Sequence, residues 1–413
     1  MNKLKKALRL IRTRGLFGLI RAVGIHFESK YSKREVSLLV RNEDFFKVNI
    51  AETPGWKLAA KKLDENKSLN IAWVMSPPAA GSGGHQTLFR FIKYTEALGH
   101  SCSVYLYDAR DHDVDVNAIS ELIKSNDGFA KVNATFHNYD SSAGVGEGID
   151  VLYATGWETC YPVFADPSLA KRLYFVQDYE PYFYPVGSEY VLAQNTYRFG
   201  FDAITAGKWL STKLAADFEM NTRSFDFAVD RNIYKRVNDE QRDAIFFYAR
   251  PVTARRGFEY GLLVLQELVR RRPGTTIHMA GWDVSNWALP VGVINHGVVD
   301  VHRMNEIYNL CSAAFVMSLT NMSLLPFELM ASGVVPIVNE GPNNRMVADH
   351  PLIKYIDTAS PVEAVDALID SLDSPAQVEQ SRELARAVEG YSWDNSAKQY
   401  EIALNELLYK QTN

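Results

Sequence analysis

Short apolar runs, each followed by turn residues and then by a helical pattern, dominate this sequence. The alternation starts at Leu69, breaks at about residue 221 and resumes at Ala244. Such alternation is typical of strands and helices that build parallel sheets. At 413 residues the chain also exceeds what one core usually holds. We therefore expect an α/β protein with two Rossmann-like, doubly wound parallel-sheet domains.

The breaks in this pattern divide the chain into five parts. Residues 69–221 and 244–390 are the two expected sheet domains, and the charged, irregular residues 222–243 are the expected linker. Residues 1–68 form a basic arm and a connector, and residues 391–413 form a terminal helix. The expected strands are 71–76, 103–107, 151–155, 173–177 and 203–206 in the first domain, and 244–248, 276–280, 294–295, 314–318 and 334–338 in the second.

The N-terminal arm is strongly basic, whereas the rest of the chain is acidic. Residues 1–34 contain ten Lys or Arg and one Glu, a charge of +9 against −5 for the whole chain, so the remaining residues carry −14. Leucine and isoleucine recur in the arm at steps of three and four residues, which predicts an amphipathic helical extension. Such a helix either lies on an anionic membrane surface or packs on the protein by its apolar face. The overall charge argues against nucleic acid as a partner.

The cysteine content indicates a reducing compartment, and the hydropathy argues against a membrane span and against secretion. The three cysteines, Cys102, Cys160 and Cys311, are far apart and form neither a disulfide framework nor a zinc pair. No stretch approaches the apolar run of about 18 residues that a membrane span needs. The N-terminus lacks the long apolar segment and the cleavage site of a secretory signal. We therefore expect a cytoplasmic protein, held at the inner face of the cell membrane if the arm binds lipid.

Two loops of the first domain have compositions that can bind a phosphate or a metal. Gly83 and Gly84 close a glycine-rich turn between a strand and its helix, where backbone amides can approach an anion, although a plain tight turn explains them equally well. Gln86 stands where a dinucleotide fingerprint needs its third glycine, which disfavours a nicotinamide enzyme. The motif D-H-D-V-D at residues 111–115 has the spacing of some metal-diphosphate sites. Solvated loop chemistry explains it better, so we expect no metal.

The strongest signals for chemistry lie in the second domain. Arg250 directly follows a strand, and Arg256 and Gly257 stand where the next helix begins. Two guanidinium groups beside a helix N-terminus suit a diphosphate, because forked donors and the helix dipole favour the same anion; a basic surface turn is the alternative. Farther along, Pro326 is expected at the first helical position, which puts Glu328 in the first turn. There a carboxylate could bind a ribose hydroxyl or simply stabilise the helix.

These residues resemble the motifs of the two-domain GT-B glycosyltransferases, particularly the retaining enzymes of glycosyltransferase family 4. In that family an Arg ends a strand, a Lys or Arg followed by Gly opens the next helix, and E-x7-E-A-M-A-x-G-x-P-V crosses the nucleotide site. Arg250, Arg256 and Gly257 match the first elements, and E-L-M-A-S-G-V-V-P at residues 328–336 matches the last. Thr320 stands where the family has its first Glu, which implies different contacts to the sugar.

A second motif, Q-D-Y-E-P-Y-F-Y-P-V-G-S-E-Y at residues 177–190, is similar to the bacterial rhamnosyltransferases of cell-surface polysaccharide assembly, those of S-layer glycans among them. The resemblance spans about residues 70–413 and includes a terminal helix that crosses back to the first domain. It implies dTDP-L-rhamnose as the donor, a rhamnose-containing lipid-linked glycan as the acceptor, and no metal cofactor.

The resemblance also implies a division of roles within the site. Arg250 and Arg256 would neutralise the leaving diphosphate, and Glu328 would hold the deoxyribose hydroxyl. Asp178 and Glu180 would orient the acceptor or stabilise an oxocarbenium-like sugar, unless they only hydrogen-bond the backbone of their turn. The other expected contacts of the nucleotide sugar are Gly83, Gly84, Trp282, Val299, Asn321, Met322, Ser323 and Leu324.

Two other functions are compatible with the same residues. A nucleotide-sugar 2-epimerase of the GT-B fold would convert the nucleotide sugar with no acceptor present. A non-catalytic module would bind the nucleotide sugar without consuming it, and the altered Thr320 position keeps that possibility open.

Overall fold

The computed structural model describes residues 37–59, 62–110 and 114–410. The amphipathic arm predicted for residues 1–34 lies outside the described residues, as do Asp111 and Asp113 of the acidic loop. None of the helices described has both the length and the apolar content needed to cross a bilayer.

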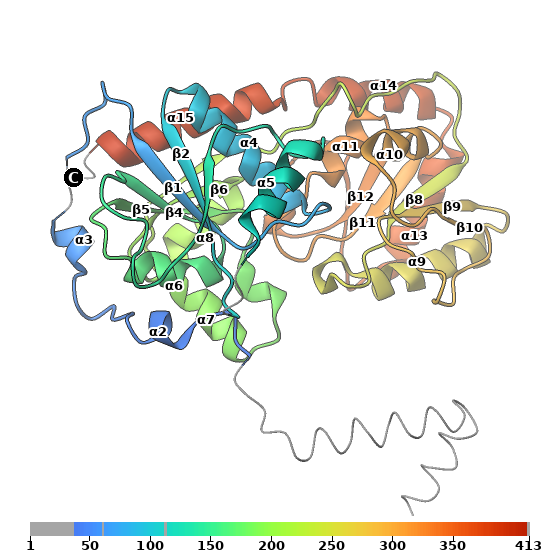
Figure 1. Ribbon diagram of the computed structural model, residues 1–413. Coiled ribbons are helices and arrows are strands. Elements are labelled where there is room, and N and C mark those ends of the chain that lie inside the picture. Colours follow the sequence, from blue (N-terminus) through green and yellow to red (C-terminus); the bar gives the residue numbers. More distant parts are fainter. Residues whose placement is uncertain (1–36, 60–61, 111–113, 411–413) are drawn as a thin grey trace, which may run out of the picture. The chain divides into compact units, whose positions relative to one another are not determined.

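The first domain is built on a seven-stranded parallel sheet with the order β3-β2-β1-β4-β5-β6-β7 (Figure 1). The chain moves outward from β1 to one edge and returns beside β1 at β4, so the switch point lies between these two strands. The strands are β1 (Asn70–Met75), β2 (Ser101–Leu106), β3 (Thr135–Asn138), β4 (Val151–Ala154), β5 (Lys171–Val176), β6 (Asp202–Ala206) and β7 (Thr222–Phe225). The helices are α4 (Gly83–Ala97), α5 (Val116–Ser125), α6 (Trp157–Ala165), the 3-10 helix η1 (Glu180–Phe183), α7 (Ser188–Thr196) and α8 (Lys208–Phe218).

The second domain repeats this plan with a six-stranded parallel sheet of order β10-β9-β8-β11-β12-β13. Its switch point lies between β8 and β11. The strands are β8 (Ala244–Tyr248), β9 (Thr276–Ala280), β10 (Val293–Asn295), β11 (Ala313–Val316), β12 (Val335–Asn339) and β13 (Lys354–Ile356). The helices are the 3-10 helix η2 (Ala254–Arg256), α9 (Phe258–Arg271), α10 (Val301–Tyr308), α11 (Leu325–Ala331), α12 (Pro342–Arg345), α13 (Pro361–Asp373) and α14 (Gln377–Ala387). The last helix of the chain is α15 (Trp393–Tyr409).

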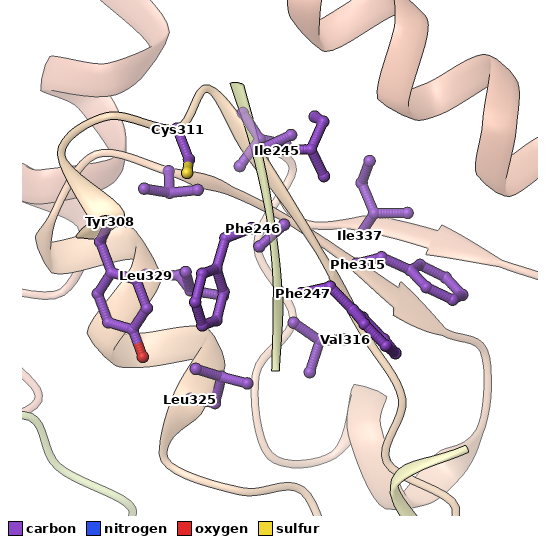
Figure 2. Packing of buried hydrophobic residues seen from close by; sticks show 14 of the residues in the cluster. Ile245, Phe246, Phe247, Tyr308, Cys311, Phe315, Val316, Leu325, Leu329 and Ile337 are labelled. Atoms are coloured by element: carbon purple, nitrogen blue, oxygen red, sulfur yellow. The ribbon is translucent and has the colours of Figure 1, made fainter. Parts of the chain in front are cut away.

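Each sheet has its own apolar core because parallel strands are covered on both faces. In the second domain Phe246 of β8 packs edge-on against Tyr308 of α10, with ring centres 4.8 Å apart, and Leu329 of α11 lies in the same cluster (Figure 2). In the first domain Trp73 of β1 stacks on Tyr153 of β4, with ring centres 4.0 Å apart. The expected α/β fold with two parallel-sheet domains is confirmed.

The connector before the first sheet packs on the first domain. It contains two short helices, α2 (Asn42–Phe45) and α3 (Gly55–Leu58). Asp44 is fully buried and accepts hydrogen bonds from the hydroxyls of Tyr107 and Ser141, each at 3.0 Å. Trp56 packs edge-on against Phe164 of α6. These connector residues are therefore part of the first domain rather than a free link.

The linker expected at residues 222–243 begins later than predicted. Residues 222–225 form β7, which pairs with β6 at the edge of the first sheet. Three of these four residues are only half-buried, so this edge strand lacks the continuous apolar run that marks a central parallel strand. Residues 226–243, all of them described, contain no helix or strand and lead directly to β8.

The last helix, α15, packs on the first sheet, beside β7 and α4 (Figure 1). Tyr400, Leu404 and Leu407 are buried in the core of the first domain. The Tyr400 hydroxyl lies 2.9 Å from the Thr95 hydroxyl and 3.2 Å from that of Tyr153. The C-terminal helix thus completes the core of the first domain.

Candidate functional site

Three arginines follow β8 at the switch point of the second sheet. The Arg250 guanidinium lies 5.9 Å from the centre of the Trp282 ring. Arg256 donates from Nη1 to the Ser318 hydroxyl at 2.8 Å, which links this loop to the residues after β11. Burial lowers the pKa of Arg256, and the neighbouring charges of Arg255 and Arg250 lower it further. The loop therefore concentrates positive charge at the edge where open α/β sheets bind ligands.

Gly257 joins the arginine loop to α9. Its φ of +55° lies in the left-handed region, and a Cβ at this position would come within 3.1 Å of the Met317 side chain. Both observations require glycine. No side chain caps the N-terminus of α9, so the first amides of a long helix lie uncapped beside the arginines.

Asparagine side chains fix the turn after β11. Asn339 accepts the Ser318 N–H at 2.7 Å and donates to the Ser318 carbonyl at 3.1 Å, and Asn343 donates to the same carbonyl at 2.8 Å. The Met322 side chain is buried in the core, so only its backbone can face a ligand. The Ser323 hydroxyl is buried without a hydrogen-bond partner among the described atoms. A ligand could satisfy it.

Glu328 lies in the first turn of α11, which begins at Leu325 and has Leu324 at its N-cap. Pro326 is therefore the second helical residue, not the first as predicted; proline fits both positions because neither N–H has a helical partner. The Tyr308 hydroxyl donates to Glu328 Oε2 at 3.4 Å. Burial raises the pKa of Glu328 to about 7. This carboxyl therefore changes charge near neutral pH.

The turns that carry Trp282 and Val299, two of the expected contacts of the nucleotide sugar, are joined by a backbone hydrogen bond. Gly281 donates its N–H to the Gly297 carbonyl at 2.8 Å. The φ of Gly281 is +113°, and a Cβ there would come within 2.5 Å of the Tyr248 ring, so the turn requires glycine. Trp282 is 40% exposed and Val299 is half-buried. The exposed part of the Trp282 ring can therefore contact a planar group.

On the first sheet, Gly83 and Gly84 form the first turn of α4. The Gly84 carbonyl accepts a hydrogen bond from Gln177 Nε2 at 3.1 Å. The Gln177 carbonyl accepts from the Asn321 side chain at 2.9 Å, and the same amide donates to the Ala206 carbonyl at 2.8 Å. The Asn321 amide therefore links the two domains. The Asn321 Oδ1 is buried without a hydrogen-bond partner among the described atoms, so the expected contact of Asn321 with the nucleotide sugar stays a prediction.

Asp178 also bridges the two domains. Its Oδ1 accepts the Asn321 N–H at 2.8 Å, and its Oδ2 accepts the Thr320 hydroxyl at 2.9 Å. Arg255 Nε lies 3.3 Å from the same Oδ2. Thr320, in the position of the first Glu of family 4, thus serves the contact between domains. Both Asp178 oxygens are thus engaged within the protein, where they hold the turn after β11 in position, and the expected contact of Asp178 with the acceptor stays a prediction.

Glu180 is turned into the first domain and is only 7% exposed. Its Oε2 accepts the Trp157 N–H at 2.6 Å and the Tyr174 hydroxyl at 3.0 Å. Burial raises the pKa of Glu180 well above its usual range, and the nearby Glu158 charge raises it further. The residue before α6 is a glycine, which has no side chain to cap the helix, so Glu180 caps it instead. Glu180 therefore fits the alternative interpretation given above, in which its carboxyl only hydrogen-bonds the backbone.

Glu158 is an acid that the sequence analysis does not single out. It lies in the first turn of α6, directly after β4 at the switch point of the first sheet. Burial raises the pKa of Glu158, and hydrogen bonding to Ser76 at the end of β1 lowers it by less. The sequence contains one signal for Glu158, which is an acid shortly after a predicted strand. Recognising it requires the strand order, which the sequence does not show.

No group of three or more His, Cys, Asp or Glu within residues 37–59, 62–110 and 114–410 could hold a metal ion. In the acidic loop Asp115 caps α5 by accepting the Ala118 N–H at 3.0 Å. This is ordinary capping chemistry for an aspartate that precedes a helix.

Two regions of the chain are similar to known domain families. Residues 243–369 match the family described as WsaF, C-terminal domain, and residues 147–206 match WsaF, N-terminal domain. The O-antigen biosynthesis protein RfbC of Myxococcus xanthus is 34% identical over 207 residues. That match covers 49% of this chain and 16% of RfbC, so the chain spans only a small part of the relative's length.

Solved structures share the fold at low sequence identity. The crystal structure of TarM has a TM-score of 0.67 at 10% identity, covering 84% of this chain and 100% of TarM. Anabaena HepE in complex with UDP and glucose has a TM-score of 0.62 at 12% identity, covering 82% of this chain and 100% of HepE. Likeness at such identities concerns the fold alone. Together with the sheet order, it shows that the chain has the α/β GT-B fold of two Rossmann-like domains.

Proposed function

We propose that this protein is a glycosyltransferase that moves a deoxyhexose, L-rhamnose from dTDP-β-L-rhamnose, onto a rhamnose-containing lipid-linked surface glycan. The observation that carries the proposal is the meeting of an arginine loop, the Glu328 carboxyl and the fixed turn after β11 at the switch point of the second sheet. Such an edge suits a nucleoside diphosphate.

The comparisons support the finer parts of the proposal. The two WsaF domain matches cover the arginine loop and the segment that holds Asp178. RfbC is described as an O-antigen biosynthesis protein, which supports a glycan of the cell surface as the acceptor. The HepE structure contains UDP and glucose, which supports a nucleotide and a sugar as ligands of this fold.

The arginines act on the leaving group. As the bond between the sugar C1 and the phosphate oxygen breaks, its electron pair leaves with the diphosphate, and Arg250 and Arg256 stabilise the added charge. The Ser323 hydroxyl and the Leu324 amide supply further donors. Glu328 accepts a hydrogen bond from the deoxyribose hydroxyl. The mechanism uses no metal, because the guanidinium groups supply the positive charge.

The transfer retains the configuration of the sugar. The acceptor hydroxyl attacks C1 from the side that the diphosphate leaves, and the departing phosphate oxygen takes the acceptor proton. The new bond joins the acceptor oxygen to C1, and the products are the extended glycan and dTDP. Asp178 holds the turn at Thr320 and Asn321, and so keeps the donors after β11 in place.

A transfer assay tests the function. The protein is incubated with a panel of nucleotide sugars and a synthetic rhamnosylated lipid diphosphate, and products are identified by mass spectrometry. We expect glycan extension with dTDP-L-rhamnose only when the acceptor is present. Conversion of the donor without acceptor would instead assign an epimerase. Binding of the donor without consumption, acceptor included, would assign a non-catalytic module.

The same proposal assigns the basic arm, residues 1–34, to the anionic inner face of the cell membrane. An enzyme that extends a lipid-linked glycan gains from this location, and each basic residue near the surface contributes about 1 kcal/mol at most. Deleting the arm should release the protein from anionic vesicles in a sedimentation assay and leave the dTDP dissociation constant unchanged. Equal vesicle binding by the shortened protein would instead favour a helix packed on the body.

A further inference from the structure

Two acids meet at the carboxyl edge of the first sheet, and they differ in how deeply they are buried. Glu180 is buried, and one of its oxygens accepts the Trp157 N–H and the Tyr174 hydroxyl. Glu158 begins the same helix but is only half-buried. Glu158 is therefore the acid of this pair that a ligand can reach.

Gly156 provides the space that the Glu158 carboxyl occupies. Both Glu158 oxygens lie 2.8 Å from the position that a Cβ on Gly156 would take. The φ of Gly156 is −156°, extended backbone that any residue adopts, so conformation does not require glycine here. Glycine is required at this position because the Glu158 carboxyl folds back over the chain at the start of α6 and takes the space of a Cβ.

Glu158 lies close to the residues that lead to the second domain. Ser76, which hydrogen-bonds Glu158, also accepts through its carbonyl from His85 at 3.0 Å. His85 belongs to the first turn of α4, which Gln177 joins to the turn after β11. A continuous series of contacts thus connects the Glu158 carboxyl with the proposed diphosphate site.

We propose that Glu158 contacts a hydroxyl group of a sugar substrate, which makes it a catalytic residue of the first domain. This inference rests on the proposed glycosyltransferase function and adds the polar group that meets the sugar on the side away from the arginines. All three acids accept hydrogen bonds within the protein, but both oxygens of Asp178 are used and Glu180 is buried, whereas Glu158 is only half-buried.

The chemistry of a partly buried carboxyl suits a neutral sugar. A protonated carboxyl can donate to one hydroxyl and accept from another, whereas a carboxylate only accepts. Burial raises the pKa of Glu158, which extends the pH range of the protonated form. Both the transferred sugar and the acceptor sugar carry hydroxyls, so the experiment must separate them.

The test compares Glu158→Gln and Glu158→Ala with the wild type in steady-state kinetics, varying donor and acceptor separately. We expect kcat/KM to fall about 10-fold for glutamine, which keeps one donor and one acceptor, and about 10²-fold for alanine. The dTDP dissociation constant should be unchanged. If the hydroxyl belongs to the acceptor, slow donor hydrolysis without acceptor is kept; if it belongs to the transferred sugar, hydrolysis falls as well.

Two further variants make the test specific. Glu147→Gln removes an exposed acid that precedes β4 at the opposite edge of the sheet, and should leave kcat/KM unchanged. Gly156→Ala should displace the Glu158 carboxyl and lower kcat/KM as Glu158→Ala does. Combining Gly156→Ala with Glu158→Ala should add less than about 2-fold, because both changes remove the same contact.

Two results would overturn the inference. Wild-type kcat/KM in Glu158→Gln would show that the carboxyl touches no substrate. Loss of dTDP binding in that variant would instead show that Glu158 has a structural role. Failure of the proposed function gives a different result, because the wild type itself would then transfer no sugar from any donor of the panel. That result would also overturn the inference about Glu158.

Discussion

The two sheets differ in the type of ionisable side chain that they carry at their carboxyl edges. The second sheet has three arginines after β8, whereas the first has Glu158 after β4 and Asp178 and Glu180 after β5. Both edges have the same topology, so the difference comes from the loops. In the proposed reaction the basic edge meets the diphosphate and the acidic edge meets the sugar. The fold thus supplies two equivalent positions, and the loop sequences decide which part of the substrate each one binds.

The largest effect is expected from the basic edge. Arg256→Ala removes a group that stabilises charge on the leaving diphosphate, so kcat at saturating donor should fall by about 10². Arg270→Ala is a matched control, because Arg270 pairs with Glu267 on the exposed surface of α9 and such pairs contribute little. Its kcat should stay within about 2-fold of the wild type. A folded Arg256→Ala protein with wild-type kcat would exclude the proposed role.

An intermediate effect is expected from the contact that joins the two edges. Asp178→Ala leaves the Asn321 N–H and the Thr320 hydroxyl without their acceptor, so the free energy of unfolding should fall by about 1–3 kcal/mol. The dTDP affinity should fall too, because the turn that carries Ser323 loses its support. Urea unfolding and calorimetric titration measure the two quantities.

Thr320→Val tests whether this contact is shared. It removes one of the donors to Asp178 and should cost less than Asp178→Ala. In the double variant the loss should stay close to that of Asp178→Ala alone, because both changes break one network. Fully additive losses would show that the two side chains act independently.

A further effect concerns pH at the basic edge. Burial raises the pKa of Glu328 from 4.5 to about 7, so the folded protein holds a proton that the unfolded chain releases earlier. The stability from this proton is complete below about pH 4.5 and is lost as the pH rises through about 7. The free energy of unfolding of the wild type should therefore decline over this window relative to Glu328→Gln.

Ligand affinity should change in the opposite direction. An ionised carboxylate accepts a stronger hydrogen bond from the deoxyribose hydroxyl, so dTDP should bind more tightly as the pH passes 7. Glu328→Gln should lack this part of the pH dependence and keep only that of the diphosphate. Identical pH profiles of wild type and variant in calorimetric titration would remove Glu328 from the site.

The central strands could be predicted from the sequence, whereas three of the four edge strands could not. The apolar runs at 244–248 and 276–280 coincide with β8 and β9, whose side chains are nearly all buried. The edge strands β3, β7 and β13 are short and largely half-buried or exposed, so they show no such run. Helix α6 contains an internal proline and is apolar on most of its surface, so it lacks the periodic pattern of an amphipathic helix.

The residues of the candidate site could also be predicted only in part. Arg250, Arg256 and Glu328 are recognisable because each follows a strand or begins a helix, and the structure brings their loops to one switch point. The roles of Asp178 and Asn321 depend on hydrogen bonds between residues that lie 142 to 144 positions apart in the sequence. Local sequence carries no information on such pairing. The same holds for Glu158, whose position depends on the strand order of the first sheet.

The packing of α15 on the first sheet affects how the chain must fold as it is made. Tyr400 contacts Thr95, 305 residues earlier in the chain, inside the core of the first domain. At a synthesis rate of about 5–20 residues per second, Thr95 is made roughly 15–60 s before Tyr400. The second domain, whose strands end at residue 356, can close its sheet first. The part of the protein that leaves the ribosome first is therefore the last to be finished.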